Sequence, residues 1–582
     1  MPNADKGNCM FKIFQKIGQS RWAVPAVLPS LILFNWVSSV IHYRFDLTED
    51  KKFTISEPTK RILKSIDSPI RVTVLLKGDY PSGFRNLCQS SEYLLSEFRE
   101  LAGKEFNYEI ISPDEKIPGT PTTYADSLTS LGFMPINLTS QVKEGQQQQL
   151  VFPIAVIHHD NRMAPVYLYK GKTPFINFQE LSGAESLLEY HFAEGIRMLT
   201  DTSRQVVGYA MGSGEPTPSE YRVFDLFQNL LTANYETYTL NLVSQPVIPA
   251  VFDVLLLVKP TLPFSDMVKL KLDQYVMNGG KLLVFIDRLN AEMDSLQVKN
   301  QVVAFDRELG IHDLLFKYGV RVNPDLIMDL QCDYLPFDVS GNGQFEFLPW
   351  NYFPRFESDY RHPINKDLGY VSGRFANSMD TTESAEIKKT VLLRTSDRTR
   401  TLASPAIISG SENVFLPDDE KYRKKNLPVA ILLEGRFGSF YRNRLSSDLS
   451  DSLEKAGVSF KASCNRENKM IVVSDGDVPL NALANGNEPI PMGHNQFTLD
   501  SRLHFPYANR DFVKNCLDYL LDESGITGLK NKDFTIRLLD AKRKKDEKIF
   551  WQVFNLLMPV LMIILFGFIL QWRRRAGYSK KM

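Results

Sequence analysis

Residues 212–216, Gly-Ser-Gly-Glu-Pro, are the first segment whose residue types could do chemistry. They follow a predicted apolar strand, at the position where open α/β sheets bind ligands. They supply only a fragment of the dinucleotide-binding pattern, because no glycine stands at its third position. Ser213 lacks the G-x-S-x-G setting of a serine nucleophile, since Gly214 follows it directly. We therefore predict a tight turn rather than a ligand-binding loop.

Acidic residues and histidines form three further candidates for metal or ligand binding. Asp287 ends a predicted strand, where an aspartate more often caps a turn than binds a ligand. Asp475 and Asp477 flank a glycine as in a calcium-binding loop, but the rest of that pattern is missing, so a turn is favoured. His158 and His159 are adjacent, so on a strand they face opposite sides and cannot bind one metal ion.

The sequence therefore gives no catalytic, cofactor-binding or metal-binding residues, and we expect a protein that is not an enzyme. No G-x-x-x-x-G-K-[ST] motif is present, so ATP hydrolysis would have to come from a partner. The five cysteines lack a C-x-x-C spacing, which favours separate small apolar residues over a disulfide or a zinc site. They are Cys9, Cys88, Cys332, Cys464 and Cys516.

Composition and length describe the body of the chain that would carry such residues. At 582 residues it is too long for one hydrophobic core, so two or three domains are expected. The 68 basic residues balance 68 acidic residues, which argues against a nucleic-acid-binding protein, because such proteins carry a basic excess.

Two uncharged apolar segments, residues 22–41 and 549–572, lie near the two ends of the chain. Each is long enough to cross a hydrocarbon core of about 30 Å as a helix. Trp551 and Trp572 bracket the second segment at the positions of interfacial anchors. A cleaved signal peptide is the alternative for the first segment, but its 21-residue basic lead is long and no clear cleavage site follows. We predict two transmembrane helices.

Basic residues in the two short tails predict the orientation. Residues 1–21 carry four lysines and arginines against one acid, and residues 573–582 carry five and no acid. Because lysine and arginine are retained on the cytoplasmic side, both tails are expected there. The basic run 542–545 would then lie outside the cytoplasm, which disagrees with this rule. Neighbouring acidic residues reduce the positive charge of that run. The prediction is a two-pass protein of the inner membrane with its central region in the periplasm.

Hydrophobic periodicity divides the central region into two α/β units. Residues 45–200 give strands at 71–76 and 107–111 around a helix near 93–98, then a hairpin and a helix at 180–199. This β-α-β order predicts a small α/β domain. Residues 204–540 give apolar strands at 206–210, 254–258 and 281–286, with helices at 221–233 and 265–277 between them. We predict a doubly wound parallel sheet.

One stretch inside the second unit differs from the rest. Residues 329–384 are aromatic, rich in proline and glycine, and without clear periodicity, which predicts a loop-like insertion. A recognition surface and a packed excursion from the sheet are both open for it, because aromatic residues are enriched in protein contacts as well as in cores. Regular patterns return at 391–393, 429–433 and 470–475, and a closing amphipathic helix is predicted at 510–521.

With these residues, the chain resembles the GldG family, auxiliary components of an ABC transporter associated with gliding motility in Bacteroidota-type bacteria. The resemblance covers nearly the whole chain. It rests on RFDLTEDKKFTIS at 44–56, MNGGKLLVFID at 277–287, GIHDLL and YGVRVN at 310–315 and 318–323, and VVSDGD and NRDF at 472–477 and 509–512. These stretches are a family-wide pattern rather than a catalytic motif.

The resemblance implies a fold and partners. It implies that residues 204–540 form an amidotransferase-like domain without the catalytic triad, and indeed no cysteine or serine stands at a nucleophile position here. It also implies a permease resembling GldF and an ATPase resembling GldA, with two copies per complex by analogy with other ABC assemblies.

We therefore expect a non-enzymatic, membrane-anchored auxiliary subunit of an ABC-transporter-like complex, whose periplasmic domain contacts envelope partners. The alternative from another class is a periplasmic receptor that binds a sugar or a peptide and feeds an ABC permease. Co-purification with a permease and an ATPase favours the first hypothesis, and a ligand-dependent shift in melting favours the second.

Overall fold

The computed structural model describes residues 54–579, apart from short gaps. The gaps are 132, 134, 143–144, 170–177, 202–203, 294–295, 297–300, 340–341, 384–385, 411–418, 485–486 and 532–546. The chain divides into two units, Met1–Ile55 and Ser56–Met582. Nearly all of the first unit, including the predicted tail 1–21 and the predicted span 22–41, lies outside the described residues, so the second unit is described below.

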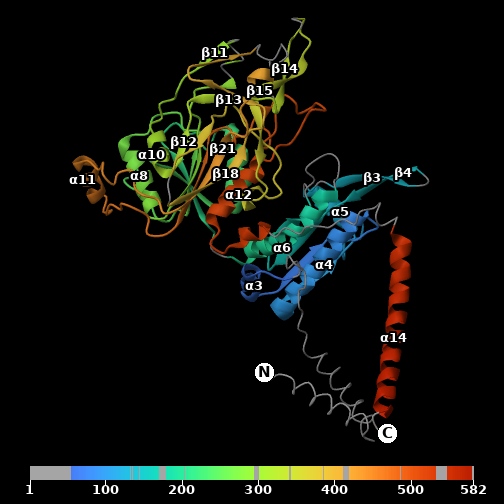
Figure 1. Ribbon diagram of the computed structural model, residues 1–582. Helices are drawn as coiled ribbons and strands as arrows, with labels where there is room; N and C mark the ends of the chain where they lie inside the picture. Colours follow the sequence, from blue (N-terminus) through green and yellow to red (C-terminus); the bar gives the residue numbers. More distant parts are fainter. Residues whose placement is uncertain are drawn as a thin grey trace. The chain divides into compact units, whose positions relative to one another are not determined.

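A four-stranded sheet with order β2-β1-β5-β6 begins the second unit. Helices α4 and α6 lie side by side in this part of the chain (Figure 1). Strand β1 pairs parallel with β2 and antiparallel with β5, and β5 and β6 form the predicted hairpin. The expected β-α-β order is confirmed, because α4 connects β1 to β2. The bounds are α3 Glu57–Lys64, β1 Ile70–Val74, α4 Ser82–Ala102, η1 Gly103–Glu105, β2 Phe106–Ile110, α5 Tyr124–Ser130, β5 Ile154–His159, β6 Arg162–Tyr167 and α6 Phe178–Thr200.

The polar segment near 146–149, which had no predicted structure, forms a β-hairpin. Strands β3 (Ile136–Val142) and β4 (Gly145–Val151) pair antiparallel over their whole length. Leu138 of β3 and Val151 of β4 are buried.

A large sheet follows, with order β14-β15-β18-β21-β22-β10-β9-β7-β8. Its parallel half contains five strands: β7 Val206–Met211, β8 Glu236–Asn241, β9 Val254–Val258, β10 Lys281–Phe285 and β22 Asn468–Val473. Strand β7 lies between β8 and β9, so in chain order these strands follow the 2-1-3-4-5 arrangement of doubly wound sheets. The predicted parallel sheet is confirmed for this half.

The other half of the sheet is antiparallel, which the prediction of a wholly parallel sheet missed. Strand β21 pairs antiparallel with β22, and β18, β15 and β14 continue in the same way. The bounds are β14 Cys332–Phe337, β15 Glu346–Ser358, β18 Ile387–Arg394 and β21 Pro428–Gly435, with β16 Val371–Ser372 paired to β15. The domain is therefore mixed α/β rather than doubly wound throughout.

The aromatic stretch 329–384, which the sequence predicts to be loop-like, contains the strands β14, β15, β16 and β17 (Met379–Thr381). Strand β15 alone covers 13 residues. Trp350, Tyr352, Phe353 and Phe356 are buried, so this part of β15 is packed into the core. Phe345, Phe347, Tyr360 and Tyr370 of the same stretch are exposed, Phe345 the most at 66%. The interpretation as a packed excursion thus holds for the four buried aromatic residues of β15, whereas Phe347 of the same strand is exposed.

Short two-stranded ribbons and helices complete the unit. The ribbons pair β11 (Gln301–Ala304) with β20 (Ala406–Ser409), β12 (Val320–Val322) with β17 (Met379–Thr381), β13 (Asp325–Asp329) with β19 (Thr399–Ala403), and β23 (Leu483–Ala484) with β24 (Glu488–Pro489). The helices are α8 Asp266–Met277, α10 His312–Tyr318, α11 Ser447–Lys455 and α12 Asn509–Leu521, with short turns η4 Pro363–Asn365, η5 Asp419–Lys421 and η6 Ile526–Asn531.

The helix predicted at 221–233 is present but irregular. It starts as a 3₁₀ turn, η2 (Tyr221–Val223), continues as a π-helix, η3 (Asp225–Leu231), and ends as α7 (Thr232–Asn234). The hydroxyl of Thr232 donates to the carbonyl of Phe227, five residues earlier. π-Helical turns are rare in proteins, and those that occur often lie at functional sites.

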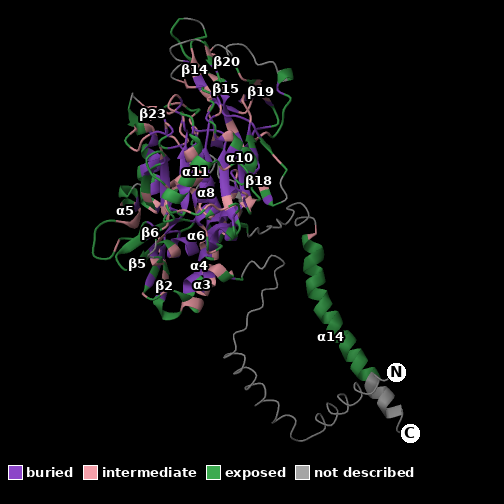
Figure 2. Ribbon diagram, turned by 90° about the vertical axis from the view of Figure 1, so that its left-hand side faces the viewer, coloured by how far each residue is buried: buried purple, intermediate pink, exposed green. Residues whose placement is uncertain are grey.

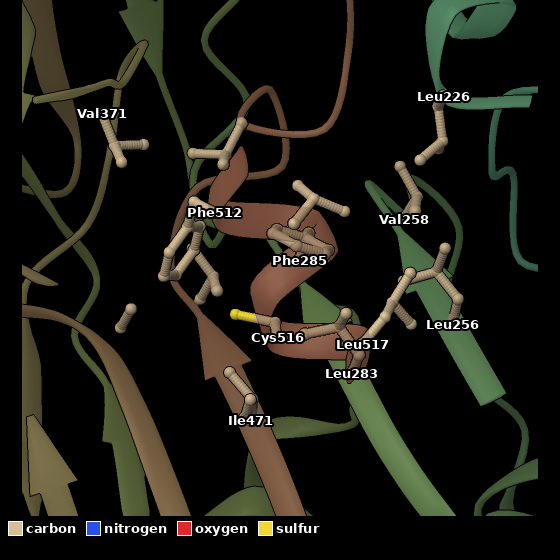
Figure 3. Packing of buried hydrophobic residues seen from close by; sticks show 14 of the residues in the cluster. Leu226, Leu256, Val258, Leu283, Phe285, Val371, Ile471, Phe512, Cys516 and Leu517 are labelled. Atoms are coloured by element: carbon tan, nitrogen blue, oxygen red, sulfur yellow. The ribbon is translucent and has the colours of Figure 1, made fainter. Parts of the chain in front are cut away.

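Helices cover both faces of the parallel half of the sheet. On one face, Phe512, Cys516 and Leu517 of α12 point towards Phe285 and Ile471 of the strands (Figure 3). On the other face, α8 and α10 pack against the alternate residues of the same strands, including Leu255, Val284 and Val472. Every residue of β9 is buried, as its apolar run predicts for a strand covered on both sides.

Helix α14 (Lys548–Ser579) contains the one segment among the described residues that is long and apolar enough to cross a membrane. This segment, Lys548–Trp572, is exposed along its whole length (Figure 2). It agrees with the predicted second span. The two-pass arrangement is not tested, because residues 22–41 lie outside the described part of the chain.

Candidate functional site

The carboxyl ends of β7, β9, β10 and β22 meet at one edge of the large sheet, because these four strands are parallel neighbours. Ligands of open α/β sheets bind at this edge. Each strand is followed there by a charged residue: Arg222 on η2 after β7, Lys259 directly after β9, Asp287 after β10, and Asp477 after β22. A ligand-binding site of this sheet is therefore expected at this edge.

A buried lysine stands at the centre of this edge. The Nζ atom of Lys259 lies 2.7 Å from both carboxylate oxygens of Asp477, 3.2 Å from Oε2 of Glu292 and 3.5 Å from Oδ2 of Asp287. Its side chain is only 2% exposed. The other oxygen of Glu292 accepts a hydrogen bond of 2.6 Å from Arg307. We call Lys259, Asp287, Glu292, Asp475 and Asp477 the ion cluster.

Backbone amides hold the carboxylates of the ion cluster in place. Asp287 Oδ1 accepts from the amide of Gly476 at 2.6 Å. The two oxygens of Asp475 accept from the amides of Asp477 at 2.9 Å and Arg374 at 2.7 Å. A Cβ atom on Gly476 would lie 2.7 Å from Cγ of Lys259 and 2.9 Å from Asp287 Oδ2, so the close approach of this backbone requires glycine.

Burial and neighbouring charges act in opposite directions on the pKa values of Lys259 and Asp477, but in the same direction on that of Asp475. Burial opposes the charge of Lys259, but the carboxylates of Asp477, Asp287 and Glu292 outweigh it and raise the lysine pKa. Burial also opposes the charge of Asp477, yet Lys259 and Arg374 hold its pKa below the ordinary value. For Asp475, burial and the neighbouring charges of Asp287 and Asp477 raise the pKa well above the ordinary value. The cluster thus holds one lysine charge among carboxyl groups of unequal acidity.

Asp287, Asp475 and Asp477 could supply ligand oxygens to one metal ion, since these atoms lie within 4.8 Å of one another. Lys259 already brings its ammonium group within ion-pair distance of Asp287 and Asp477. The lysine therefore supplies the positive charge that a cation would supply, and we interpret the arrangement as an ion network. Sequence reasoning treated Asp287 and the 475–477 turn separately, and it missed Lys259, whose signal is a charge directly after an apolar strand.

A cavity of about 590 Å³ opens above the ion cluster. Its charged lining residues come from separate loops at the carboxyl edge, with Arg374 added from the segment after β16. Asn481 anchors the cavity wall, because its amide donates to the carbonyl of Arg222 at 2.9 Å and its side chain accepts from the amide of Asp225 at 3.1 Å. The charged lining residues are Arg222, Lys259, Glu292, Arg374, Asp477 and Asp500.

The glycine-rich segment after β7 does not line this cavity. Gly212 and Gly214 both have positive φ angles, and the segment forms the backbone bend that the sequence predicts. The carbonyl of Ser213 accepts from the amides of Thr261 and Leu262 at 2.9 and 2.8 Å. These bonds join the loops after β7 and β9 directly, and Ser213 is 2% exposed. The arrangement is that of a structural turn.

The adjacent histidines face opposite sides of β5, as predicted: His158 is exposed and His159 is buried. The structure places Ser68 beside them, with its Oγ 2.7 Å from Nε2 of His159. Asp160 stands 3.9 Å from the other ring nitrogen and 3.4 Å from Ser68 itself. A catalytic triad needs a carboxylate in hydrogen-bond contact with that nitrogen, and 3.9 Å is beyond it.

The described cysteines are free thiols, and three of them, Cys332, Cys464 and Cys516, are buried. Burial raises the pKa of each of these three thiols. A raised pKa disfavours the thiolate that a nucleophile or metal ligand needs. Cys9 lies outside the described residues.

Comparison with known proteins identifies the family to which the chain is similar. Residues 204–516 match a family described as "ABC-type uncharacterized transport system", and residues 49–158 match a domain of unknown function. An "uncharacterized protein" of Borreliella burgdorferi is 20% identical over 554 residues, which cover 92% of this chain and 94% of that protein.

Solved structures give only weak likeness. The mmIFT52 N-terminal domain is 12% identical with a TM-score of 0.30, covering 54% of this chain and 97% of that one. The exo-β-1,4-mannosidase Op5Man5 from Opitutaceae bacterium strain TAV5 is 11% identical with a TM-score of 0.18, covering 68% of this chain and 46% of that one. Because the family match spans more than half of the sequence, the chain belongs to the auxiliary-protein family of ABC-type transport systems.

Proposed function

We propose that this protein is a non-enzymatic, membrane-anchored subunit of an ABC-transporter-like complex associated with gliding motility, and that it is GldG-like within its family. The observation that carries the proposal is the family match over residues 204–516 together with the exposed apolar segment of α14. The match supports an auxiliary role in transport, and the helix supports attachment to a membrane.

The proposal assigns the chemistry of the complex to its partners. A permease resembling GldF would contact the membrane helices, and an ATPase resembling GldA would hydrolyse ATP. Two copies of each subunit per complex are proposed by analogy. Within this chain, Ser213 is buried in a turn and the thiols of Cys332 and Cys516 are buried with raised pKa values, which supports a body without a nucleophile. We propose that residues 204–540 have an amidotransferase-like fold that lacks the catalytic triad.

The topology belongs to the same proposal: two membrane passes in the inner membrane, both tails cytoplasmic, and the body between them in the periplasm, where it contacts envelope partners. The basic residues of both tails support this orientation. Relative movement of permease and ATPase would then reach the body through the membrane helices.

Co-purification tests the complex. The tagged full chain, extracted in mild detergent from its own host, should retain a permease and an ATPase of the ABC class in a stable ratio. A variant in which Leu561, Ile564 and Phe568 of α14 are changed to alanine keeps the helix but trims its apolar surface, and should lose the permease. Recovery of the full chain without either partner, in an extract where permease and ATPase remain bound to each other, would contradict the proposal.

Cysteine accessibility tests the topology. Val251 is 59% exposed, so the Val251→Cys variant in a Cys88→Ser background offers a reactive thiol on the body. A maleimide that cannot cross the inner membrane should label this thiol in cells whose outer membrane has been opened. Cys9 should react only after the inner membrane is also opened. Labelling of the thiol at position 251 from the ATP-containing side alone would overturn the periplasmic placement.

A further inference from the structure

Two guanidinium groups line the cavity above the ion cluster with hydrogen-bonding capacity left over. Arg374 makes no side-chain hydrogen bond or ion pair with the described residues, and Arg222 uses only its Nε, which donates to Glu220 at 2.7 Å. A guanidinium carries five N–H donors in a planar fork that fits a carboxylate or a phosphate. Both groups therefore present unused donors to one cavity.

The structure fixes both arginines in place. The backbone of Arg222 is held by Asn481, whose amide donates to its carbonyl, and the Nε bond to Glu220 leaves the two terminal nitrogens of the fork free for another group. Arg374 is held by the bond from its amide to Asp475, and its guanidinium carbon lies 5.4 Å from the ring centre of Phe353. Groups held in place before binding lose less entropy when a ligand arrives.

None of the described carboxylates that line the cavity forms an ion pair with Arg222 or Arg374, although both arginine charges help to lower the pKa of Asp477. Asp477 and Glu292 are already paired with Lys259, and Glu292 also with Arg307. Asp500 lines the same cavity but is exposed to solvent, where an attraction between charges is strongly screened. No carboxylate of the described residues lies within ion-pair distance of Arg374.

Apolar side chains line the same cavity. Phe375 is buried, and Phe497 and Leu480 are half-buried beside it. Ligand cavities that combine an apolar lining with a few fixed polar groups bind small organic molecules, whose apolar part supplies affinity and whose polar part supplies orientation. The other apolar lining residues are Met293, Ala482, Leu483, Ala484 and Leu499.

We propose that this cavity binds a small organic ligand through an oxyanion group, a carboxylate or a phosphate, held between Arg222 and Arg374, with the apolar part of the ligand against Phe375 and Phe497. Such a site gives the body a function beyond its membrane attachment and its transporter partners. The ligand would be recognised at the carboxyl edge of the parallel strands, where the fold brings its loops together.

Binding of four probes to the purified full chain in detergent tests the site, with isothermal titration calorimetry as the measurement. The probes are inorganic phosphate, acetate, phenyl phosphate and phenylacetate. The two aromatic probes should bind at least tenfold more tightly than the two small ones, because only they can use the apolar lining. The tighter of phenyl phosphate and phenylacetate identifies the oxyanion class.

Arginine variants connect the binding to the two guanidinium groups. Arg374→Gln and Arg222→Gln should each weaken the better aromatic probe by about tenfold or more, since each removes a charged hydrogen-bond donor. Arg321→Gln, on the exposed side of β12, is the matched control and should leave binding unchanged. Equal weakening in all three variants, binding insensitive to both cavity variants, or no binding of any probe at millimolar concentration would overturn the proposal.

Chemical protection keeps the proposal falsifiable if a cavity variant fails to fold. Phenylglyoxal modifies accessible arginines of the unaltered protein, and peptide mass spectrometry reports each position separately. The better aromatic probe should slow modification of Arg222 and Arg374 at least severalfold and leave Arg321 unaffected. Unchanged modification of both cavity arginines at a saturating probe concentration would place the probe elsewhere and refute the site.

Discussion

The ammonium group of Lys259 lies 2.7 Å from both carboxylate oxygens of Asp477, although 218 positions separate the two residues in the chain. Lys259 directly follows β9, and Asp477 follows β22, with β10 between the two strands in the sheet. The pair therefore links the carboxyl ends of strands that are not direct neighbours. It also forms the floor of the cavity that Arg222 and Arg374 line.

Replacing Lys259 by methionine should strongly destabilise the protein. The substitution keeps an unbranched side chain of similar length but leaves Asp477 and Asp287 without their buried cation. Removing one partner of a buried ion pair costs about 3–5 kcal/mol, because the remaining charge has no partner. The free energy of unfolding, measured by urea titration of the full chain, should fall by this amount. Lys388→Met is the control, since that lysine is 74% exposed and its carboxylate partner lies 3.7 Å away.

A second prediction concerns the glycine between the two acidic residues of the 475–477 turn. In a Gly476→Ala variant the new Cβ would lie 2.7 Å from Cγ of Lys259 and 2.9 Å from Oδ2 of Asp287. Overpacking of this kind costs about 1–3 kcal/mol, so the urea midpoint should fall. Gly438→Ala is the matched control, because its added Cβ would meet no atom within 4 Å. Equal stability of the two variants would show that the cluster is looser than the structure indicates.

A third prediction uses the opposite pKa shifts of Asp475 and Asp477. The pKa of Asp475 is raised, so its contribution to stability is present at low pH and is lost as pH rises through its folded value. An Asp475→Asn variant cannot lose that proton, so its stability deficit should be largest at low pH and should narrow as pH rises. The pKa of Asp477 is lowered, so the deficit of Asp477→Asn should be largest near neutral pH and narrow as pH falls below 3.8.

The free energy of unfolding of the wild type and both variants, measured from pH 3 to pH 8, checks this pair of signs. The two variants differ by the same chemical change and lie two residues apart, so each serves as the control for the other. Deficits that move in the same direction with pH would contradict the opposite pKa shifts of Asp475 and Asp477.

The order of the strands and helices in the parallel half could be predicted from the sequence. The apolar run at 254–258 predicts β9, and the serine before residues 266–277 predicts the start of α8, whose amide at Val268 does donate to the side chain of Ser265. These signals are local, because burial on both faces and helix capping leave their mark on a few consecutive residues.

The antiparallel half and the cavity could not be predicted in the same way. Strand β15 contains Pro349 and Pro354, and proline within an apolar run argues against a strand unless a bulge or an edge accommodates it. The register of β14 against β15 does shift between Cys332 and Asp333, opposite this region. Lys259 was missed because its partners come from distant loops, and their meeting depends on the strand order of the whole sheet.

The last prediction concerns Lys530, which is buried on η6 between α6 and α12. Its Nζ donates to Asn515 at 2.9 Å and lies 4.5 Å from the ring centre of Tyr190. Burial lowers the lysine pKa to about 8, although Asp518 raises it in part. The folded protein therefore binds this proton less tightly than the unfolded chain, so the wild type should gain stability as pH rises from about 8 towards the unfolded lysine value near 10.4.

A Lys530→Met variant should lack this gain, because methionine carries no titrating group. The difference in free energy of unfolding between variant and wild type should favour the variant most at pH 7 and shift towards the wild type as pH rises to about 10. Urea titrations of both proteins at several pH values measure the difference. Lys388→Met, which alters an exposed lysine, controls for loss of charge alone. A difference that stays constant from pH 7 to pH 10 would show that Lys530 titrates as it does in the unfolded chain, and hence that η6 does not bury its charge.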